Sequence, residues 1–136
     1  MKKITQDNRG SVAILFALLA SLLLLATGMA VDYGRAMSSR TRLNAAADSV
    51  ALFAVSHNQM SIDGSGNTVG NQAVQIFLDE TKTFVEQNGV TITSVTPEFI
   101  QKTDSVWEFR LSYTALSKNY FAQIFGHNLA NFPING

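Results

Sequence analysis

The sequence contains no cysteine among its 136 residues. A disulfide bond, a thiolate metal site and a cysteine nucleophile are therefore excluded for this chain. Histidine is scarce as well, because His57 and His127 are its only two copies and neither has a second residue at a metal-ligand spacing. We expect no catalytic residue, no metal and no cofactor.

Charge is missing from residues 11–31, which hold eleven Leu, Ile, Val or Phe residues. As a helix this run spans roughly 31 Å, about the thickness of the hydrocarbon core of a bilayer. The strongly apolar side chains favour insertion by about 5 kcal/mol. We therefore expect an N-terminal tail at residues 1–10 and a transmembrane helix at residues 11–31.

A cleaved secretory signal is the alternative interpretation of this run. Lys2 and Lys3 precede it, and residues 26–28 offer a small-residue cleavage site. The apolar part of a signal runs roughly 7–15 residues, which is shorter than this one. A retained helix is favoured; cleavage would instead release a secreted or periplasmic soluble binding domain that begins near Met29.

The charges on the two sides of the run do not determine its orientation, because three basic residues lie on each side. They are Lys2, Lys3 and Arg9 before it, and Arg35, Arg40 and Arg42 after it. Beyond Arg42 the chain has four basic and eight acidic residues, a net charge of −4. This acidity argues against a nucleic-acid partner.

Turn residues are also missing where the apolar run meets polar sequence, since residues 22–48 contain no proline and no glycine cluster. The apolar spacing of one helix face persists beyond Val31, at Leu43, Ala46, Ala47, Val50, Ala51 and Ala54. We therefore predict one helix from about Gly10 to about Val55, roughly 70 Å long, whose part at residues 32–57 forms a stalk.

Small residues recur four apart within the membrane segment, a pattern that favours close helix–helix packing in lipid. The two ridges are Ala13, Ala17 and Ser21, and Ala26, Ala30 and Gly34. We expect Leu43, Ala47 and Val50 to continue the packing along the stalk, with Ser39 off the packed stripe. Alanine and serine are also common in membrane helices without such a role, and this interpretation stays open.

The remaining residues, 58–136, predict a small α+β head of helices on an antiparallel sheet. A loop at residues 63–70 is expected to precede an amphipathic helix at residues 71–88. Its inward-facing residues are Val74, Phe77, Leu78, Phe84 and Val85.

Two strands are expected next, at residues 90–96, limited by Pro97, and at residues 105–115. The second strand carries Trp107, Phe109, Leu111 and Tyr113 on one face. A short helix at residues 117–126, capped by Ser117, and an edge strand at residues 128–134 complete the head. We expect the stalk stripe to be covered by the sheet face of Trp107, Phe109 and Leu111, or by a helix of a partner.

Three stretches carry a family resemblance. They read RGSVAILFA at residues 9–17, GMAVDYGRA at residues 28–36 and RLNAAADSVAL at residues 42–52. As a set they resemble the TadG-like N-terminal region of the TadE/TadG-like family, the tight-adherence (Flp-type) pilus-assembly proteins. Residues 120–126, YFAQIFG, are similar to the aromatic and glycine closing element of that family.

The resemblance implies a membrane-anchored pilus-assembly component, minor pilin or pseudopilin. The residues themselves offer no catalytic cluster, so we expect no enzymatic activity. Its implied place is the bacterial inner membrane, crossed once, with the N-terminus in the cytoplasm and the head outside. Its implied partners are the membrane and other pilus-assembly proteins or pilin subunits, with no nucleic acid and no small-molecule substrate.

The resemblance also assigns individual residues. Asp32, Tyr33 and Arg35 form the family motif at the membrane exit, where Asp32 and Arg35 are expected to set the depth of the helix. Gly10 is the implied processing site of a prepilin peptidase, although Leu15 stands where cleaved members carry glutamate.

Overall fold

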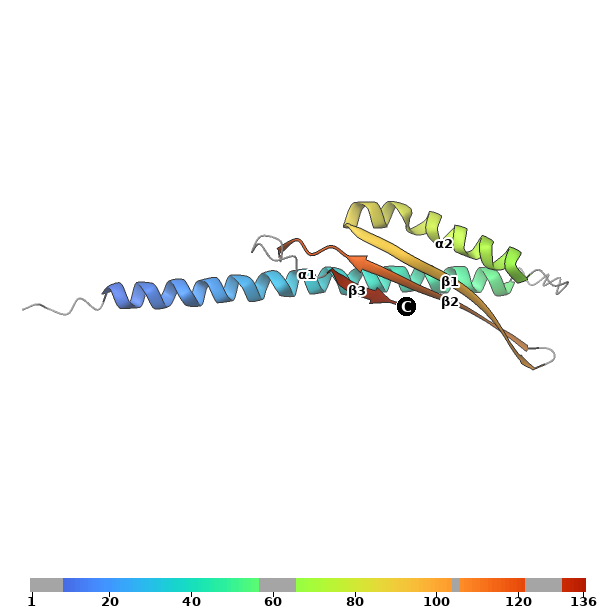
Figure 1. Cartoon of the computed structure of the whole chain (residues 1–136), viewed down its shortest axis with the longest axis horizontal. Coiled ribbons are helices and arrows are strands. Elements are labelled where there is room, and N and C mark those ends of the chain that lie inside the picture. The colour runs from blue at the N-terminus through green and yellow to red at the C-terminus, as the bar shows by residue number, and fades with distance from the viewer. Residues whose placement is uncertain (1–8, 57–65, 104–105, 122–130) are drawn as a thin grey trace, which may run out of the picture.

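A computed structural model of the chain describes residues 9–56, 66–103, 106–121 and 131–136. Its elements are α1 (Arg9–Ser56), α2 (Gly66–Asn88), β1 (Val90–Thr103), β2 (Val106–Ser117) and β3 (Phe132–Asn135). The strands form one antiparallel sheet in the order β1-β2-β3. Figure 1 shows α1 as a long rod, with α2 and the sheet gathered along its C-terminal half. The predicted α+β class with a long N-terminal helix is confirmed.

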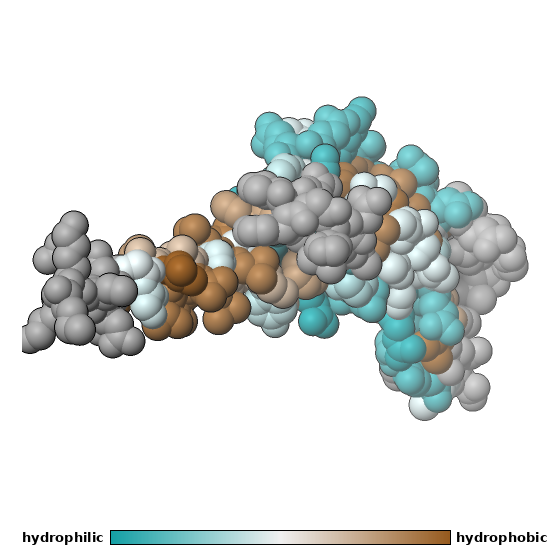
Figure 2. Space-filling view, turned by 60° about the vertical axis from the view of Figure 1, so that its left-hand side comes forward, coloured by the Kyte–Doolittle hydropathy of each residue, from teal (hydrophilic) through white to brown (hydrophobic). Residues whose placement is uncertain are grey.

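Helix α1 runs without a break for 48 residues, as the absence of turn residues predicts. Its most apolar window has a mean hydropathy of 2.5, and the helix is long and apolar enough to cross a membrane. Large apolar side chains in its N-terminal half, such as Phe16 and Leu23, are exposed. In Figure 2 this half is a mostly apolar rod that leads into a more polar head.

The core of the head forms where one face of α1 meets α2 and the sheet. Leu43 and Val50 of α1 are fully buried, as is Phe77 of α2. The opposing residues of the sheet are Leu111, Tyr113 and Ala115 of β2 and Ile134 of β3. The stalk stripe is therefore covered by the head of its own chain, as expected for Leu111; the side chain of Trp107 lies outside the described ones.

The buried face of α1 is longer than the stripe predicted from the sequence. Its members repeat at spacings of four, four and three residues, and they are Gly28, Asp32, Ala36, Ser39, Leu43, Ala47, Val50 and Ala54. The prediction that Ser39 lies off the packed stripe is wrong, because its side chain is only 4% exposed. The head therefore covers α1 from Gly28, within the uncharged run, upwards.

Helix α2 begins earlier than its glycine-rich sequence predicts, because residues 66–70, assigned to a loop, are its first turn. A Cβ atom at Gly70 would lie 3.3 Å from the ring of Pro97 on β1, so the missing side chain permits close packing on the strand. Tertiary contact has overridden the weak helix propensity of this segment. Residues 63–65 of the predicted loop lie outside the described residues.

Strand β1 continues through Pro97 to Thr103, although Pro97 was expected to limit it. The residue pairs with Leu111 of β2, and β1 is an edge strand, where a missing N–H group is tolerated. Ser117 does not cap a helix as predicted, because it is the last residue of β2 and pairs with Val90 and Phe132. Residues 122–126 of the predicted short helix, and residues 128–130 of the last strand, lie outside the described residues.

The far ends of β1 and β2 extend beyond the helices as a hairpin arm (Figure 1). At the base of this arm, the rings of Phe99 and Phe109 pack on each other with centroids 4.8 Å apart, and Phe109 is half-buried against the core, on the face expected from the sequence. Glu108 lies 2.9 Å from Lys102 and 2.9 Å from Arg110, and hydrogen bonds from these two cations lower the pKa of its carboxyl group. Such exposed ion pairs contribute little to stability.

Tyr113 joins the sheet to α1 through a polar contact inside the core. Its hydroxyl donates a hydrogen bond to Asn44 Oδ1 at 2.6 Å, and the carbonyl oxygen of Arg40 lies 3.3 Å away. Burial raises the pKa of the Tyr113 phenol above its ordinary value, because the anion would be poorly solvated there.

Replacing Ala47 by leucine is expected to lower the free energy of unfolding of the head by about 1–3 kcal/mol, because three extra carbon atoms must enter a closed contact. Ala45→Leu is the matched control, since Ala45 is exposed on the same helix. The measurement is denaturant unfolding of the full chain in detergent micelles, followed by hydrogen exchange of β2 amides. Equal stability of the two variants would contradict the packing described here.

Tyr113 is expected to make the stability of the head fall at alkaline pH. Because its pKa is higher in the folded than in the unfolded chain, the contribution is complete below about pH 10 and is lost as the pH rises through the folded pKa. Tyr113→Phe should cost about 0.5–1.5 kcal/mol at neutral pH and flatten the alkaline decline. The control is Tyr33→Phe, at an exposed ring; an unchanged decline in the Tyr113 variant would refute the assignment.

Candidate functional site: a collar at the end of the apolar run

The chain returns from the end of β2 towards the apolar half of α1 through residues 118–121 (Figure 1). The return begins directly after β2, where the Lys118 amide donates to the carbonyl oxygen of Gly89 at 3.0 Å, beside the paired residues Val90 and Ser117. Gly89 has a φ angle of +62°, a left-handed conformation that glycine adopts without strain. Beyond this contact, Tyr120 and Phe121 lie against the side of α1.

The carboxylate of Asp32 receives the returning chain. Its Oδ1 accepts the Tyr120 amide at 3.2 Å, and its Oδ2 accepts the Phe121 amide at 3.0 Å. Asp32 is only 3% exposed, so both bonds are shielded from water. Hydrogen bonds to a charged acceptor are stronger than neutral ones, and this pair fixes the height at which the segment meets α1.

Gly28, one turn before Asp32 on α1, leaves the space that the side chain of Phe121 occupies. A Cβ atom at Gly28 would lie 3.0 Å from Cβ and 3.2 Å from Cγ of Phe121. Glycine therefore lets the Phe121 side chain lie directly on the backbone of α1.

Arg35, the last residue of the motif, stacks on the ring of Tyr120. The guanidinium of Arg35 lies over the Tyr120 ring, 4.5 Å from its centroid, and the ammonium of Lys118 lies 5.8 Å from the same centroid. Each such cation–π contact is worth about 0.5–1 kcal/mol at an exposed site.

Tyr33 contacts the start of the last strand. Its ring meets that of Phe132 edge to face, with centroids 6.3 Å apart and an interplanar angle of 78°. Asp32 and Arg35 thus contact residues 120–121, and Tyr33 contacts the start of β3. We call this group the collar; its members are Gly28, Asp32, Tyr33 and Arg35 of α1, with Tyr120, Phe121 and Phe132.

The contacts of the collar are of the kind that attach one part of a protein to another. It contains one carboxylate, occupied by amide donors, and cations stacked on a ring. These contacts fix the head to α1 at one height and one rotation.

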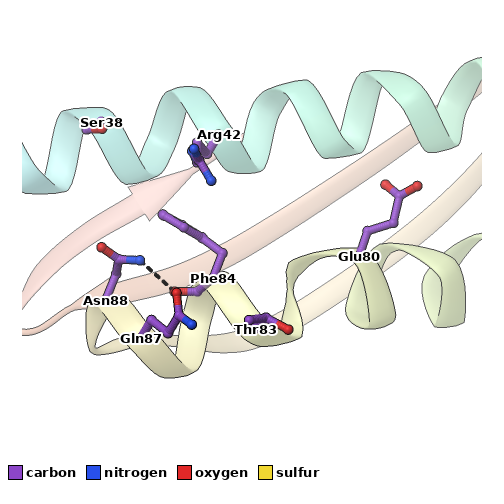
Figure 3. A pocket seen from close by; sticks show the side chains of 7 residues that line it. All are labelled: Ser38, Arg42, Glu80, Thr83, Phe84, Gln87 and Asn88. Carbon is purple, nitrogen blue, oxygen red and sulfur yellow. Dashed lines mark hydrogen bonds between the residues drawn. The ribbon is translucent and has the colours of Figure 1, made fainter.

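A second feature is a polar cleft of roughly 520 Å³ between α1 and α2. Figure 3 shows its lining residues, which are Ser38, Arg42, Glu80, Thr83, Phe84, Gln87 and Asn88. The Arg42 guanidinium lies 5.3 Å from the centroid of the Phe84 ring, and Asn88 donates to the Phe84 carbonyl oxygen at 2.9 Å. Arg42 and Glu80 are its two ionisable side chains, a single pair of opposite charge.

Within the part of the chain that the structure describes, no three His, Cys, Asp or Glu side chains group closely enough to share a metal ion. His57 and His127 lie outside the described residues. The predicted packing residues divide into two sets. Leu43, Ala47 and Val50 lie in the core, whereas Ala13, Ala17, Ala26, Ala30 and Gly34 are exposed along α1.

Gly34 and the predicted processing residue Gly10 both face open space, since a Cβ atom at either would meet nothing within 4 Å.

Sequence reasoning identified the Asp32 motif and the aromatic residues of the closing element separately but missed that they touch. It placed Asp32 and Arg35 at the exit as depth markers, whereas the contacts join both residues to residues 118–121. The available signal was Gly28, the one glycine in the uncharged run, which stands one turn before Asp32.

Comparison with known families agrees with the motifs. Residues 10–57 match the family described as putative Flp pilus-assembly TadE/G-like. The resemblance predicted from the sequence is therefore confirmed over α1, which supplies the helix side of the collar. The match supports a role in pilus assembly, with contacts to other pilus components in general. The long apolar helix fits a single-pass membrane anchor in such a system.

No curated protein and no solved structure matches the chain.

Gly28→Ala should loosen the collar, because its methyl group would crowd the Phe121 side chain at 3.0–3.3 Å. Gly34→Ala is the matched control, since both changes gain about 1 kcal/mol of helix propensity but only one meets a neighbour. Hydrogen exchange of the Tyr120 and Phe121 amides should speed up in the first variant and stay unchanged in the second. Identical exchange rates in the two variants would contradict the close contact between Gly28 and Phe121.

Asp32→Asn should weaken the attachment of residues 118–121 by about 1.5–3 kcal/mol, because the bonds lose their charged acceptor. The same exchange measurement reports the effect, with Asp48→Asn as a control on the exposed side of α1. Protection of the two amides that survives the change at Asp32 would contradict the role of this carboxylate.

Proposed function

We propose that this chain is a membrane-anchored pilus-assembly component, or minor pilin or pseudopilin, of a tight-adherence (Flp-type) system. It acts without catalysis, through helix–helix packing along α1 and protein contacts of the head. In this proposal the N-terminus lies in the cytoplasm of a bacterium, the helix crosses the inner membrane once, and the head lies outside.

The observation that carries the proposal is the division of α1 into two differently used halves. The head of the same chain covers one face from Gly28 to Ala54, whereas the apolar side chains before Gly28 are mostly exposed. A helix built in this way presents its lower half to lipid or to other helices and carries a folded head on its upper half. The family match at residues 10–57 covers this same helix.

The exposed ridge of Ala26, Ala30 and Gly34 supports packing against another subunit. All three lie on the side of α1 away from the buried face, because each stands two residues, roughly half a turn, from a buried position: Ala26 from Gly28, Ala30 from Asp32, and Gly34 from Ala36. Small side chains there let a second helix approach closely, in lipid and at its surface.

A crosslinking experiment tests the proposal, and the lack of cysteine makes it clean. Single cysteines at Ala30 and Gly34 should form adducts with other pilus components in the native host. A cysteine at Ala36, under the head, is the matched control and should form none. The proposal is overturned if neither exposed position yields an adduct and deletion of the gene leaves piliation unchanged.

The mass of the protein recovered from membranes tests its anchoring. An intact mass near 14.8 kDa indicates a retained helix, and loss of the first ten residues indicates processing after Gly10. A chain that begins near Met29 and is released without detergent would instead establish the secreted binding domain. A cytoplasm-dependent fluorescent reporter fused after Gly136 should stay dark; a bright fusion would reverse the proposed topology.

A further inference from the structure

We propose that residues 118–121 lie in the membrane–water interface, so that the head rests on the bilayer rather than above it. The partner is the lipid surface, which receives the Phe121 ring below the headgroups and the Tyr120 ring among them. This inference rests on the membrane anchor of the proposed function and adds a second, shallower contact with lipid.

The first argument is depth. Phe121 lies on Gly28, three residues before the end of the uncharged run at Val31, which corresponds to roughly 4.5 Å along the helix. Residues 11–27 alone span roughly 26 Å, less than the roughly 30 Å of a hydrocarbon core. A bilayer that covers the whole run therefore reaches the level of Phe121.

The second argument is exposed apolar surface at this level. Phe121 is 40% exposed and Tyr120 38% exposed, although both contact α1. Met29 and Val31 are exposed on the helix beside them. Figure 2 shows the apolar surface of α1 continuing to the base of the head. Aromatic side chains with one polar end are the residues that collect at membrane interfaces.

The third argument concerns the backbone. A chain outside a regular helix can lie at membrane depth only where its polar groups are bonded within the protein. The amides of Tyr120 and Phe121 meet this condition, because both donate to the buried Asp32 carboxylate. The same carboxylate is compensated by these donors, which lowers the cost of its position next to the apolar run.

The fourth argument is the placement of charge. Arg35 and Lys118 lie against the Tyr120 ring, on the head side of Phe121. Long basic side chains just above an apolar level can reach lipid phosphates while their stems stay on apolar surface. The order along α1 is therefore apolar ring, phenol ring and cations, as a bilayer surface requires.

Depth-dependent fluorescence quenching tests the inference on the full chain. The single Trp107 is replaced by phenylalanine, and a tryptophan is introduced by Phe121→Trp, Leu19→Trp or Phe109→Trp in separate variants. Each variant is reconstituted into vesicles of phosphatidylethanolamine and phosphatidylglycerol that contain brominated phosphatidylcholine. Bromine is placed either near the glycerol end of the acyl chain or near its methyl end.

The tryptophan at 121 should be quenched several-fold more by the shallow bromine than by the deep one. The tryptophan at 19 should respond to the deep bromine, and the one at 109, half-buried in the head, to neither. No quenching at 121 together with quenching at 19 overturns the inference while leaving the anchor intact. No quenching at 19 shows instead that the anchor, and with it the proposed function, is wrong.

A labelling measurement keeps the test independent of the bulk of tryptophan. Tyr120→Cys should react several-fold more slowly with a water-soluble maleimide in vesicles than in detergent-free urea, whereas Ser112→Cys, at an exposed position of β2, should react quickly in both. Equal rates at the two positions in vesicles would place the return segment in water and overturn the inference.

Discussion

The bonds between the Asp32 carboxylate and the amides of Tyr120 and Phe121 are the interaction on which the rest of this architecture depends. Each bond joins two residues that are almost ninety positions apart in the chain. Both lie where the apolar part of α1 gives way to its polar part. Without them the sheet would still pack on Leu43 and Val50, but residues 120–121 would lose two hydrogen bonds to α1. The carboxylate thereby adds a polar attachment to a helix that also packs against the head through its apolar face.

Much of this fold follows from the sequence, for a physical reason. The uncharged run, the lack of turn residues beyond it and the spacing of Leu43, Ala47 and Val50 each reflect local or helical geometry, and they predict α1 correctly. Strand β2 alternates in the same local way. The class and the long helix are therefore readable from pattern alone.

The errors arise where distant contacts decide. Residues 66–70 look like a loop, yet Gly70 packs on Pro97; Pro97 looks like the end of a strand, yet an edge position tolerates it. Ser39 looks like surface, yet the head covers it. The collar belongs to the same group, because no local pattern states that Asp32 accepts hydrogen bonds from residues almost ninety positions later. Its two halves were visible as separate motifs, and only the tertiary structure joins them.

The buried face of α1 has a consequence for torsion. Gly28, Ser39 and Val50 are separated by eleven residues each, as are Asp32, Leu43 and Ala54. An eleven-residue period corresponds to about 3.67 residues per turn, close to that of an undistorted α-helix, so the covered face runs nearly straight along the rod. The collar and the core of the head therefore contact the same face of α1 at two positions along its axis. Because α1 continues unbroken before Gly28, the direction in which the ridge at Ala13 and Ala17 faces around the helix axis is fixed relative to the head. A rotation of the head about the helix axis therefore rotates this ridge by the same angle.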